Sequence, residues 1–182
     1  GTFGNFGAFS FQGAKLLVSG EGGMLVTNDK KLYKKALKIS NHGRSEKKQF
    51  YIDGPGVKYK MSNIQAALAY GQLSRIEVLI ALKRRIFSWY EKHLKNINSL
   101  SLNYETEDTK SIFWMTSLVL LKKIKIKRET LSRKLYKNRI DTRPVFPELS
   151  SFKIWGHKKN NILYKNSKYL SKNALNLPSG VC

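Results

Sequence analysis

The stretch "FSFQGAKLLVSGEGGMLVTND", residues 9–29, decides the fold of this chain. It places Lys15 five positions after Ser10 and just before an apolar run that ends in a turn with three glycines. Small and aromatic residues alternate up to Ser10, which predicts a short buried strand, and "MLVT" after the glycines predicts a second strand. The chain contains 26 lysines, so the question is whether this one, set between a strand and a turn, has a chemical role.

A lysine can act as a catalyst when desolvation or neighbouring charges lower its pKa and it attacks a carbonyl group. The best-known partner is pyridoxal phosphate, whose ring accepts electrons and whose phosphate needs hydroxyl and backbone N–H donors. Ser10 can supply such a hydroxyl, and the glycines at 20, 22 and 23 allow a sharp backbone turn beside a cofactor. These residues alone leave two interpretations open, a Schiff-base lysine at position 15 and an ordinary solvated lysine.

The composition indicates a globular protein with a strongly positive charge. The 182 residues are 41% hydrophobic, which is enough for the core of one domain or slightly more. Lysine and arginine number 34 against 12 acidic residues, and the resulting net charge of +22 is typical of proteins with an anionic partner. However, the 26 lysines and 8 arginines are scattered along the chain, whereas nucleic-acid readers favour arginine forks. We therefore interpret the charge as a compositional bias and do not expect a nucleic-acid partner.

The cysteine content and the length of the apolar runs indicate the cellular compartment of the protein. The one cysteine, Cys182, cannot form a disulfide within the chain, which fits a reducing compartment. The first residues lack the pattern of a signal peptide, and the longest purely apolar run, residues 78–82, is far too short for a membrane span. Three scattered histidines and a terminal cysteine do not make a metal site. We expect a soluble, cytoplasmic protein that binds no metal.

The first part of the chain predicts two helices separated by a long loop. Residues 29–40 have apolar side chains near helical spacing behind Asp29 as a cap, and Gly43 ends this helix. Residues 44–60 are polar and form a loop of a length that is usually functional or disordered. A capping box at Ser62 then begins a helix with an apolar stripe.

The second part begins with a second helix at 82–95, which is basic on its outer side and holds Phe87, Tyr90 and Leu94 on its inner side. The elements that follow are a strand at 111–121, a short helix at 128–138, an extended segment at 139–149, a weak helix at 160–173 and a final strand and turn at 175–180. Because strands and helices alternate, the predicted fold class is α/β, in two parts joined near residues 81–84.

The stretch around Lys15 resembles the Schiff-base lysine segment of the nucleotide-sugar aminotransferases of the DegT/StrS family. In that pattern a serine, a phenylalanine, three variable residues and the lysine are followed by "GEGG" and a strand. Further similar segments occur in the family's order: "NHGR" (41–44), "YKMSNIQAALAYGQLSRIE" (59–77), "SIFWMTSLVL" (111–120), "RIDTRPVFPEL" (139–149) and "ALNLPSG" (174–180). The resemblance spans essentially the whole chain and is greatest to the perosamine-synthase-type 4-aminotransferases.

The resemblance implies that the chain is part of a fold-type I, pyridoxal-phosphate-dependent transferase. Residues 1–81 would be the C-terminal segment of the large cofactor-binding domain, and residues 82–182 the small C-terminal α/β domain, incomplete at its end. Family members are considerably longer, and their first half, which carries the aspartate that pairs with the pyridine nitrogen, has no counterpart here. We therefore expect this chain to be inactive alone.

The resemblance also implies roles for individual residues. Lys15 becomes the Schiff-base lysine and proton carrier, and Ser10 a ligand of the cofactor phosphate. The family forms homodimers in which the loop before the capping box reaches the neighbouring active site, and Lys58 there takes the place of an asparagine that touches the phosphate. Gln12 would face the substrate, and Arg143 a nucleotide diphosphate. Solvated surface side chains remain the simpler alternatives for Lys58, Gln12 and Arg143.

The expected function is therefore that of an aminotransferase, or of a fragment of one. It would move an amino group from glutamate to the keto group of a nucleotide-linked keto-deoxy sugar. Some family members are dehydratases that lack the lysine, and Lys15 argues against that branch. His42 is expected to be a turn residue, and Trp114 and Phe146 packing residues. Two alternatives remain open: a basic binding module, favoured by the lysine excess, and an inactive remnant of such an enzyme, favoured by the missing half.

Overall fold

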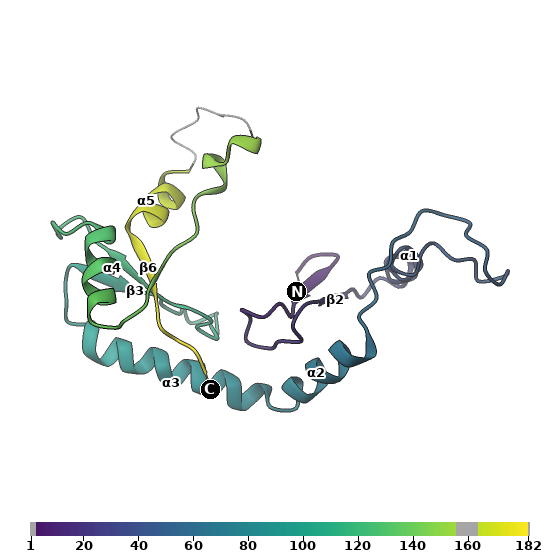
Figure 1. Cartoon of the computed structure of the whole chain (residues 1–182), viewed down its shortest axis with the longest axis horizontal. Coiled ribbons are helices and arrows are strands. Elements are labelled where there is room, and N and C mark those ends of the chain that lie inside the picture. Colours follow the sequence, from purple (N-terminus) through teal and green to yellow (C-terminus); the bar gives the residue numbers. More distant parts are fainter. Residues whose placement is uncertain (1–2, 156–163, 182) are drawn as a thin grey trace. The chain divides into compact units, whose positions relative to one another are not determined.

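The computed structural model describes residues 3–155 and 164–181 (Figure 1). The chain divides into two compact units, residues 1–77 (unit 1) and residues 78–182 (unit 2). Unit 1 contains a two-stranded sheet with two helices, and unit 2 contains a four-stranded sheet with its own helices. The assignment of residues 1–81 and 82–182 to two domains of a larger enzyme stays a prediction.

The sheet of unit 1 is an antiparallel ribbon of β1 (Gly7–Ser10) and β2 (Gly23–Val26). The two strands pair from Gly7 opposite Val26 to Ser10 opposite Gly23, which confirms the two predicted strands. The expectation that the first strand is buried is wrong, because Phe9 is 47% exposed and Met24, directly opposite, is 50% exposed. The reason is that neither face of the ribbon is covered within the described part of the chain.

Helix α1 (Lys30–Ser40) has the ends that were predicted for it. The Asp29 side chain accepts hydrogen bonds from the N–H groups of Lys31 and Leu32, at 2.7 and 3.1 Å. At the other end, the Gly43 N–H donates to the Lys38 carbonyl at 2.9 Å, with a φ of 63° at Gly43. His42, with a φ of 62°, and Gly43 both leave the helical region and so end the helix, and glycine adopts such a positive φ at the least cost.

The long loop after α1 folds back on itself into an arm, residues 45–60. Isolated bridges pair Asn41 with Lys58 and Arg44 with Ile52, and the Val57 N–H donates to the Ile39 carbonyl at 2.8 Å. The Lys38 ammonium lies 2.5 Å from Asp53, and its hydrogen bond, followed by one from Ser45, lowers the pKa of Asp53. The arm is therefore tied to the end of α1 rather than free along its length.

Helices α2 (Asn63–Leu73) and α3 (Ile76–Leu94) follow the arm, with a turn at 74–75 between them. The predicted capping box is confirmed, since the Gln65 N–H donates to Ser62 Oγ at 3.3 Å and the Ser62 N–H donates to Gln65 Oε1 at 3.2 Å. The expected start of a separate helix at residue 82 is wrong, because α3 is one uninterrupted helix. None of the helices in the described ranges combines the length and apolarity that a membrane crossing requires.

The sheet of unit 2 has the strand order β3-β4-β6-β5, with all pairs antiparallel. Its strands are β3 (Leu100–Leu102), β4 (Thr116–Leu120), β5 (Arg143–Pro144) and β6 (Ala174–Leu177). The helices of this unit besides α3 are α4 (Arg128–Lys137), α5 (Lys165–Asn173) and two short 3-10 turns, Leu149–Ser151 and Lys153–Trp155. Leu118 on β4 lies opposite Leu102 on one side and Leu175 on the other, and the leucines of β4 and β6 are the buried ones.

Several predictions for unit 2 need correction. The strand expected at 111–121 begins at Thr116, because Phe113 has a φ of 47°, which is outside the extended region. Strand β3 was missed, since three residues are too few for a periodic pattern. Phe146 is exposed and is not a packing residue, whereas Trp114 is half-buried. The first residues of the helix expected at 160–173 lie outside the described residues, and α5 begins at Lys165.

Lys83 contradicts the expectation that the outer side of α3 carries its basic residues, because this side chain is buried. Its Nζ donates to the carbonyl of Trp114 at 2.9 Å and to that of Ser179 at 2.5 Å. Tyr90, two turns further on, donates from its hydroxyl to the Pro178 carbonyl at 2.8 Å. Burial lowers the pKa of Lys83. Two side chains of α3 therefore hold the segment after β6 against the helix.

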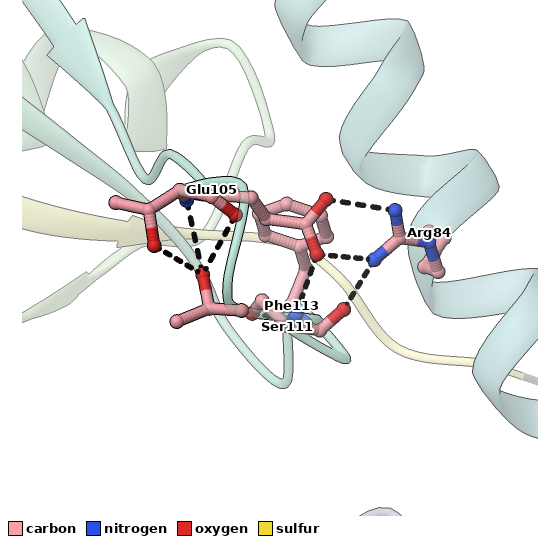
Figure 2. A network of polar contacts seen from close by, with 6 residues as sticks. Arg84, Glu105, Ser111 and Phe113 are labelled. Carbon is pink, nitrogen blue, oxygen red and sulfur yellow. Dashed lines mark hydrogen bonds and ion pairs between the residues drawn. The ribbon is translucent and has the colours of Figure 1, made fainter.

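Arg84, the next residue, forms a second network, which fixes the loop between β3 and β4 (Figure 2). Its guanidinium donates to both carboxylate oxygens of Glu105, at 2.7 and 2.8 Å, and to the Ser111 carbonyl at 2.5 Å. The Ser111 N–H donates to Glu105 at 2.5 Å, and Phe113 stacks on Phe87 with 3.7 Å between ring centroids. The hydrogen bonds from Arg84, followed by that from Ser111, lower the pKa of Glu105 from 4.5 to about 2.

This network predicts an acid-dependent contribution to stability. Because the pKa of Glu105 is lower in the folded chain than its ordinary value of 4.5, the stabilisation is complete above pH 4.5 and is lost as the pH falls through about 2. We expect the melting temperature of unit 2, followed by circular dichroism, to fall more steeply across this window in the natural chain than in Glu105→Gln. Glu107→Gln, a change at an exposed carboxylate on the same loop, serves as the control. Parallel curves for the natural chain and Glu105→Gln would contradict the assignment.

Candidate functional site

Lys15 lies on the loop that joins β1 to β2, residues 11–22. This loop, together with Ser10 at the end of β1, is referred to here as the Lys15 loop. Two backbone hydrogen bonds close its base, from Phe11 N–H to the Gly22 carbonyl and from Ser19 N–H to the Phe11 carbonyl, both 2.9 Å. The Lys15 N–H donates to the Gln12 carbonyl at 2.9 Å, which makes a tight turn. The lysine is half-buried, so its side chain leaves a fixed backbone and has restricted freedom.

Gly23 allows the second strand to approach the first at the end of this loop. It lies opposite Ser10 in the ribbon, and a Cβ at Gly23 would lie 2.5 Å from the carbonyl oxygen of Phe9. A real Cβ cannot approach a backbone oxygen so closely, so only glycine fits. The "GEGG" turn is therefore required for strand pairing next to Ser10 and Lys15.

Ser10 and Gln12 flank the turn that carries Lys15. Ser10 is exposed, and its Oγ accepts a long contact of 3.5 Å from the Gln12 N–H. The side chain of Gln12 is also exposed, and its Oε1 accepts the Ala14 N–H at 2.9 Å, which supports the turn from outside. The loop thus presents an amine, a hydroxyl and an amide within six consecutive residues.

Ser19 is a structural residue of the site that sequence reasoning missed. It is buried, and its Oγ donates to the Glu21 carbonyl at 2.6 Å, while its N–H closes the loop base on Phe11. Both bonds hold the "GEGG" turn in place. The available signal was its position immediately before the glycines, where a small hydroxyl residue often stabilises a turn.

The structure places the other predicted site residues elsewhere. Lys58 is exposed on the arm, paired with Asn41 through an isolated bridge. His42 is a turn residue as predicted, with a φ of 62° and its N–H donating to the Val57 carbonyl at 3.1 Å. Arg143 belongs to unit 2, where it is exposed and lies 3.1 Å from Asp141.

Comparisons with known proteins show the family of the chain. The model of the DegT/DnrJ/EryC1/StrS aminotransferase family matches residues 1–181. The chain belongs to this family. The GDP-perosamine synthase of Escherichia coli O157:H7 is 37% identical to this chain over 180 residues, which cover 98% of this chain and 48% of that protein. The GDP-perosamine synthase of Vibrio cholerae is 33% identical over 184 residues, which cover 100% of this chain and 50% of that protein.

Solved structures of other proteins share its fold. A GDP-4-keto-6-deoxymannose-3-dehydratase mutant with bound GDP-perosamine matches with a TM-score of 0.87 at 25% identity, over 98% of this chain and 51% of that one. The aminotransferase TlmJ from Streptoalloteichus hindustanus matches with a TM-score of 0.87 at 23% identity, over 98% and 47%. The predicted α/β fold class is confirmed.

The chain spans about half the length of the curated relatives it matches. The half of the Escherichia coli relative that this chain does not match is called the complementary half below. Mixing this polypeptide with the present chain provides the complex in which the site residues are tested below.

Replacing Gly23 by alanine should force β2 away from β1, because the added Cβ would collide with the Phe9 carbonyl. In the complex with the complementary half, we expect the free energy of unfolding to fall by about 1–3 kcal/mol, as for other steric conflicts with fixed backbone. Urea denaturation followed by circular dichroism measures the change. The matched control is Gly180→Ala, where a Cβ would meet no atom within 4 Å. Equal stability of the two variants would refute the close approach.

Proposed function

We propose that this chain is the lysine-bearing half of a pyridoxal-phosphate-dependent aminotransferase. The reaction is the transfer of an amino group from glutamate to the keto group of a nucleotide-linked keto-deoxy sugar. The observation that carries the proposal is the position of Lys15, half-buried on a loop whose base is closed by two backbone hydrogen bonds. Family membership and the two GDP-perosamine synthases at 37% and 33% identity support it.

The residues of the Lys15 loop fit pyridoxal phosphate. Lys15 offers a primary amine from a fixed backbone, and Ser10 offers an exposed hydroxyl whose proton is available to a phosphate oxygen. When bound, pyridoxal phosphate supplies an aldehyde that takes up amines and a ring that stabilises the electron pair released at the substrate carbon. An amine and a hydroxyl on one short loop are the donors that these two groups require.

Lys15 has two tasks in this proposal. Its Nζ would hold the cofactor between turnovers. After the amino donor has displaced it, the neutral Nζ would take a proton from the amino-bearing carbon of the donor and later give a proton to the former keto carbon of the sugar. Both tasks need the amine within a narrow range of positions. The closure of the loop at Phe11 and Gly22 serves this need, because it fixes the backbone from which the side chain extends.

Ser10 holds the phosphate end by donating from its Oγ, which orients the cofactor relative to Lys15. Gln12 is proposed to contact the sugar, since its Oε1 is used by the Ala14 N–H and its amide protons remain as donors. Arg143 is proposed to bind the nucleotide diphosphate, because a guanidinium fork matches phosphate oxygens.

A cytoplasmic location stays a prediction from the cysteine content.

The enzyme is further proposed to be a homodimer in which Lys58 contacts the cofactor phosphate of the neighbouring subunit. The support is that the arm is held at α1 by the Lys38–Asp53 ion pair and by backbone hydrogen bonds, while Lys58 is exposed on it. A lysine binds phosphate as a point charge. Each active site would then require both chains.

The role of Lys15 is tested by covalent trapping. In the complex with the complementary half, borohydride reduction in the presence of pyridoxal phosphate should attach the cofactor to Lys15 Nζ, and peptide mapping by mass spectrometry identifies the site. Lys15→Ala should remove both the label and the yellow absorbance of the complex. Lys30→Ala, at an exposed lysine at the start of α1, should keep both. A label on a different lysine would make the assignment wrong.

The role of Lys58 is tested by subunit mixing. Lys58→Ala should weaken cofactor binding about ten- to hundredfold, the effect of losing a charged hydrogen bond of about 1.5–3 kcal/mol. Mixing Lys15→Ala with Lys58→Ala chains should restore part of the transaminase activity, because one hybrid site carries both intact residues. Lys47→Ala, also exposed on the arm, should bind cofactor normally. Mixed dimers without recovered activity would return Lys58 to the role of a solvated surface charge.

A further inference from the structure

The stretch from the end of β4 to the end of α4, in unit 2, carries an unusually one-sided charge. Residues 121–139 contain nine lysines and arginines and one acidic residue, Glu129. The chain as a whole has 34 of the former and 12 of the latter, so the positive excess is greater here than the general lysine content explains. Such a stretch forms a binding surface only if its cations face solvent on the same part of the molecule, which the structure decides.

The loop between β4 and α4 is anchored on unit 2 and presents lysines outward. The isoleucines at 124 and 126 are partly buried, and the Ile124 N–H donates to the Leu121 carbonyl at 3.0 Å, which makes a turn at the start of the loop. The lysines that alternate with these isoleucines are all exposed: Lys122, Lys123, Lys125 and Lys127. The loop therefore holds four ammonium groups in solvent from a backbone that lies against the unit.

Helix α4 continues this basic surface. Its inner side faces the sheet, because the helix packs against β6 and the Ser132 hydroxyl lies 2.9 Å from that of Thr142. Its outer side carries four exposed side chains: Arg133, Lys134, Tyr136 and Lys137. Because an α-helix has 3.6 residues per turn, these four share one half of its circumference. The loop leads directly into the helix, so the exposed cations of the loop and of this outer side adjoin; together they are called the basic strip below.

Carboxylates do not neutralise the basic strip within the described part of the chain. Glu129, the acidic residue of α4, lies 2.7 Å from the Arg128 guanidinium, which is not part of the strip. Asp141, beyond the end of the helix, instead lies 3.1 Å from Arg143. None of the strip's cations forms an ion pair with a described carboxylate. The strip therefore keeps its full charge for an anionic partner.

We propose that the basic strip is a docking surface for an anionic lipid bilayer. Clusters of lysine and arginine on an amphipathic helix attract anionic headgroups, and each cation near the surface strengthens binding about fivefold. Tyr136, on the same side of α4, is 71% exposed, and an amphipathic ring of this kind suits the headgroup level of a membrane. The inference goes beyond the proposed reaction and does not depend on Lys15.

A nucleic acid fits the basic strip less well than a lipid surface. All but one of the strip's cations are lysines, which bind phosphate as point charges and lack the fork with which arginine reads bases. Single strands are held by stacking on several aromatic side chains, whereas residues 121–139 contain one, Tyr136. A fluid lipid surface requires only clustered charge and an amphipathic side chain, and the strip supplies both.

Flotation of the full chain with lipid vesicles in a density gradient tests this inference, because aggregates sink and bound protein rises. The chain should float with vesicles of phosphatidylcholine and phosphatidylglycerol, but not with phosphatidylcholine alone, and salt should release it. The triple variant Lys122→Gln, Lys123→Gln and Lys125→Gln should bind about a hundredfold more weakly. The matched control is Lys30→Gln, Lys31→Gln and Lys34→Gln, which removes the same charge from exposed positions of α1 and should bind as the natural chain does. No flotation with the anionic vesicles, or equal losses in the two triple variants, would overturn the proposal.

A second pair of variants tests the orientation of α4. Tyr136→Ser should lower the floating fraction, whereas Tyr104→Ser, at an 82% exposed tyrosine on the loop between β3 and β4, should not. Equal flotation of these two variants would contradict the placement of the outer side of α4 at the membrane. Thermal unfolding followed by circular dichroism should be the same in all variants, since every changed residue is exposed. Binding of duplex DNA that the loop variant loses while it floats like the natural chain would assign the strip to nucleic acid and overturn the proposal.

Discussion

The hydrogen bond from the Phe11 N–H to the Gly22 carbonyl is the contact on which the candidate site depends. It joins the last residue before the Lys15 turn to the glycine-rich segment after it, and so converts the ten residues of chain between them, 12–21, into a closed loop. Next to this hydrogen bond, Gly23 of β2 lies so close to the Phe9 carbonyl of β1 that a Cβ would not fit between them. Without this hydrogen bond the amine of Lys15 would lie on a flexible connection, and an effective catalyst needs its groups held in place.

Unit 2 depends on two adjacent cations of α3 that act in different environments. Lys83 is buried and satisfied by two backbone carbonyls, so its charge is held without a carboxylate on the described chain. Arg84 instead pairs with Glu105 and fixes the loop before β4. A buried lysine is costly unless its protons find acceptors, and here those acceptors belong to segments that must lie against the helix. Lys83 therefore ties α3 to Trp114 and to the segment after β6. Arg84 ties the same helix to the loop between β3 and β4.

The two units differ in how they use apolar residues. Unit 2 buries leucines of β4 and β6 together with Leu79 and Phe87 of α3, which is a core in the ordinary sense. Unit 1 presents its apolar residues outward, on the ribbon and on a helix without charge. The same unit carries Lys15, Ser10 and Lys58. The part of the chain that carries the proposed site is thus also the part whose large apolar side chains are exposed.

What the sequence by itself determined is local. The cap at Asp29, the capping box at Ser62 and Gln65, the stop at Gly43 and the serine–lysine–glycine pattern around Lys15 depend on residues a few positions apart, so their spacing was enough to predict them. Only the tertiary structure decided the burial of Lys83, the exposure of Phe9 and Phe146, the continuity of α3 and the strand order β3-β4-β6-β5. These features arise from contacts between residues far apart in the chain, such as Lys83 with Ser179. No local pattern encodes such contacts, because the free energy of burying a side chain depends on which distant segments surround it.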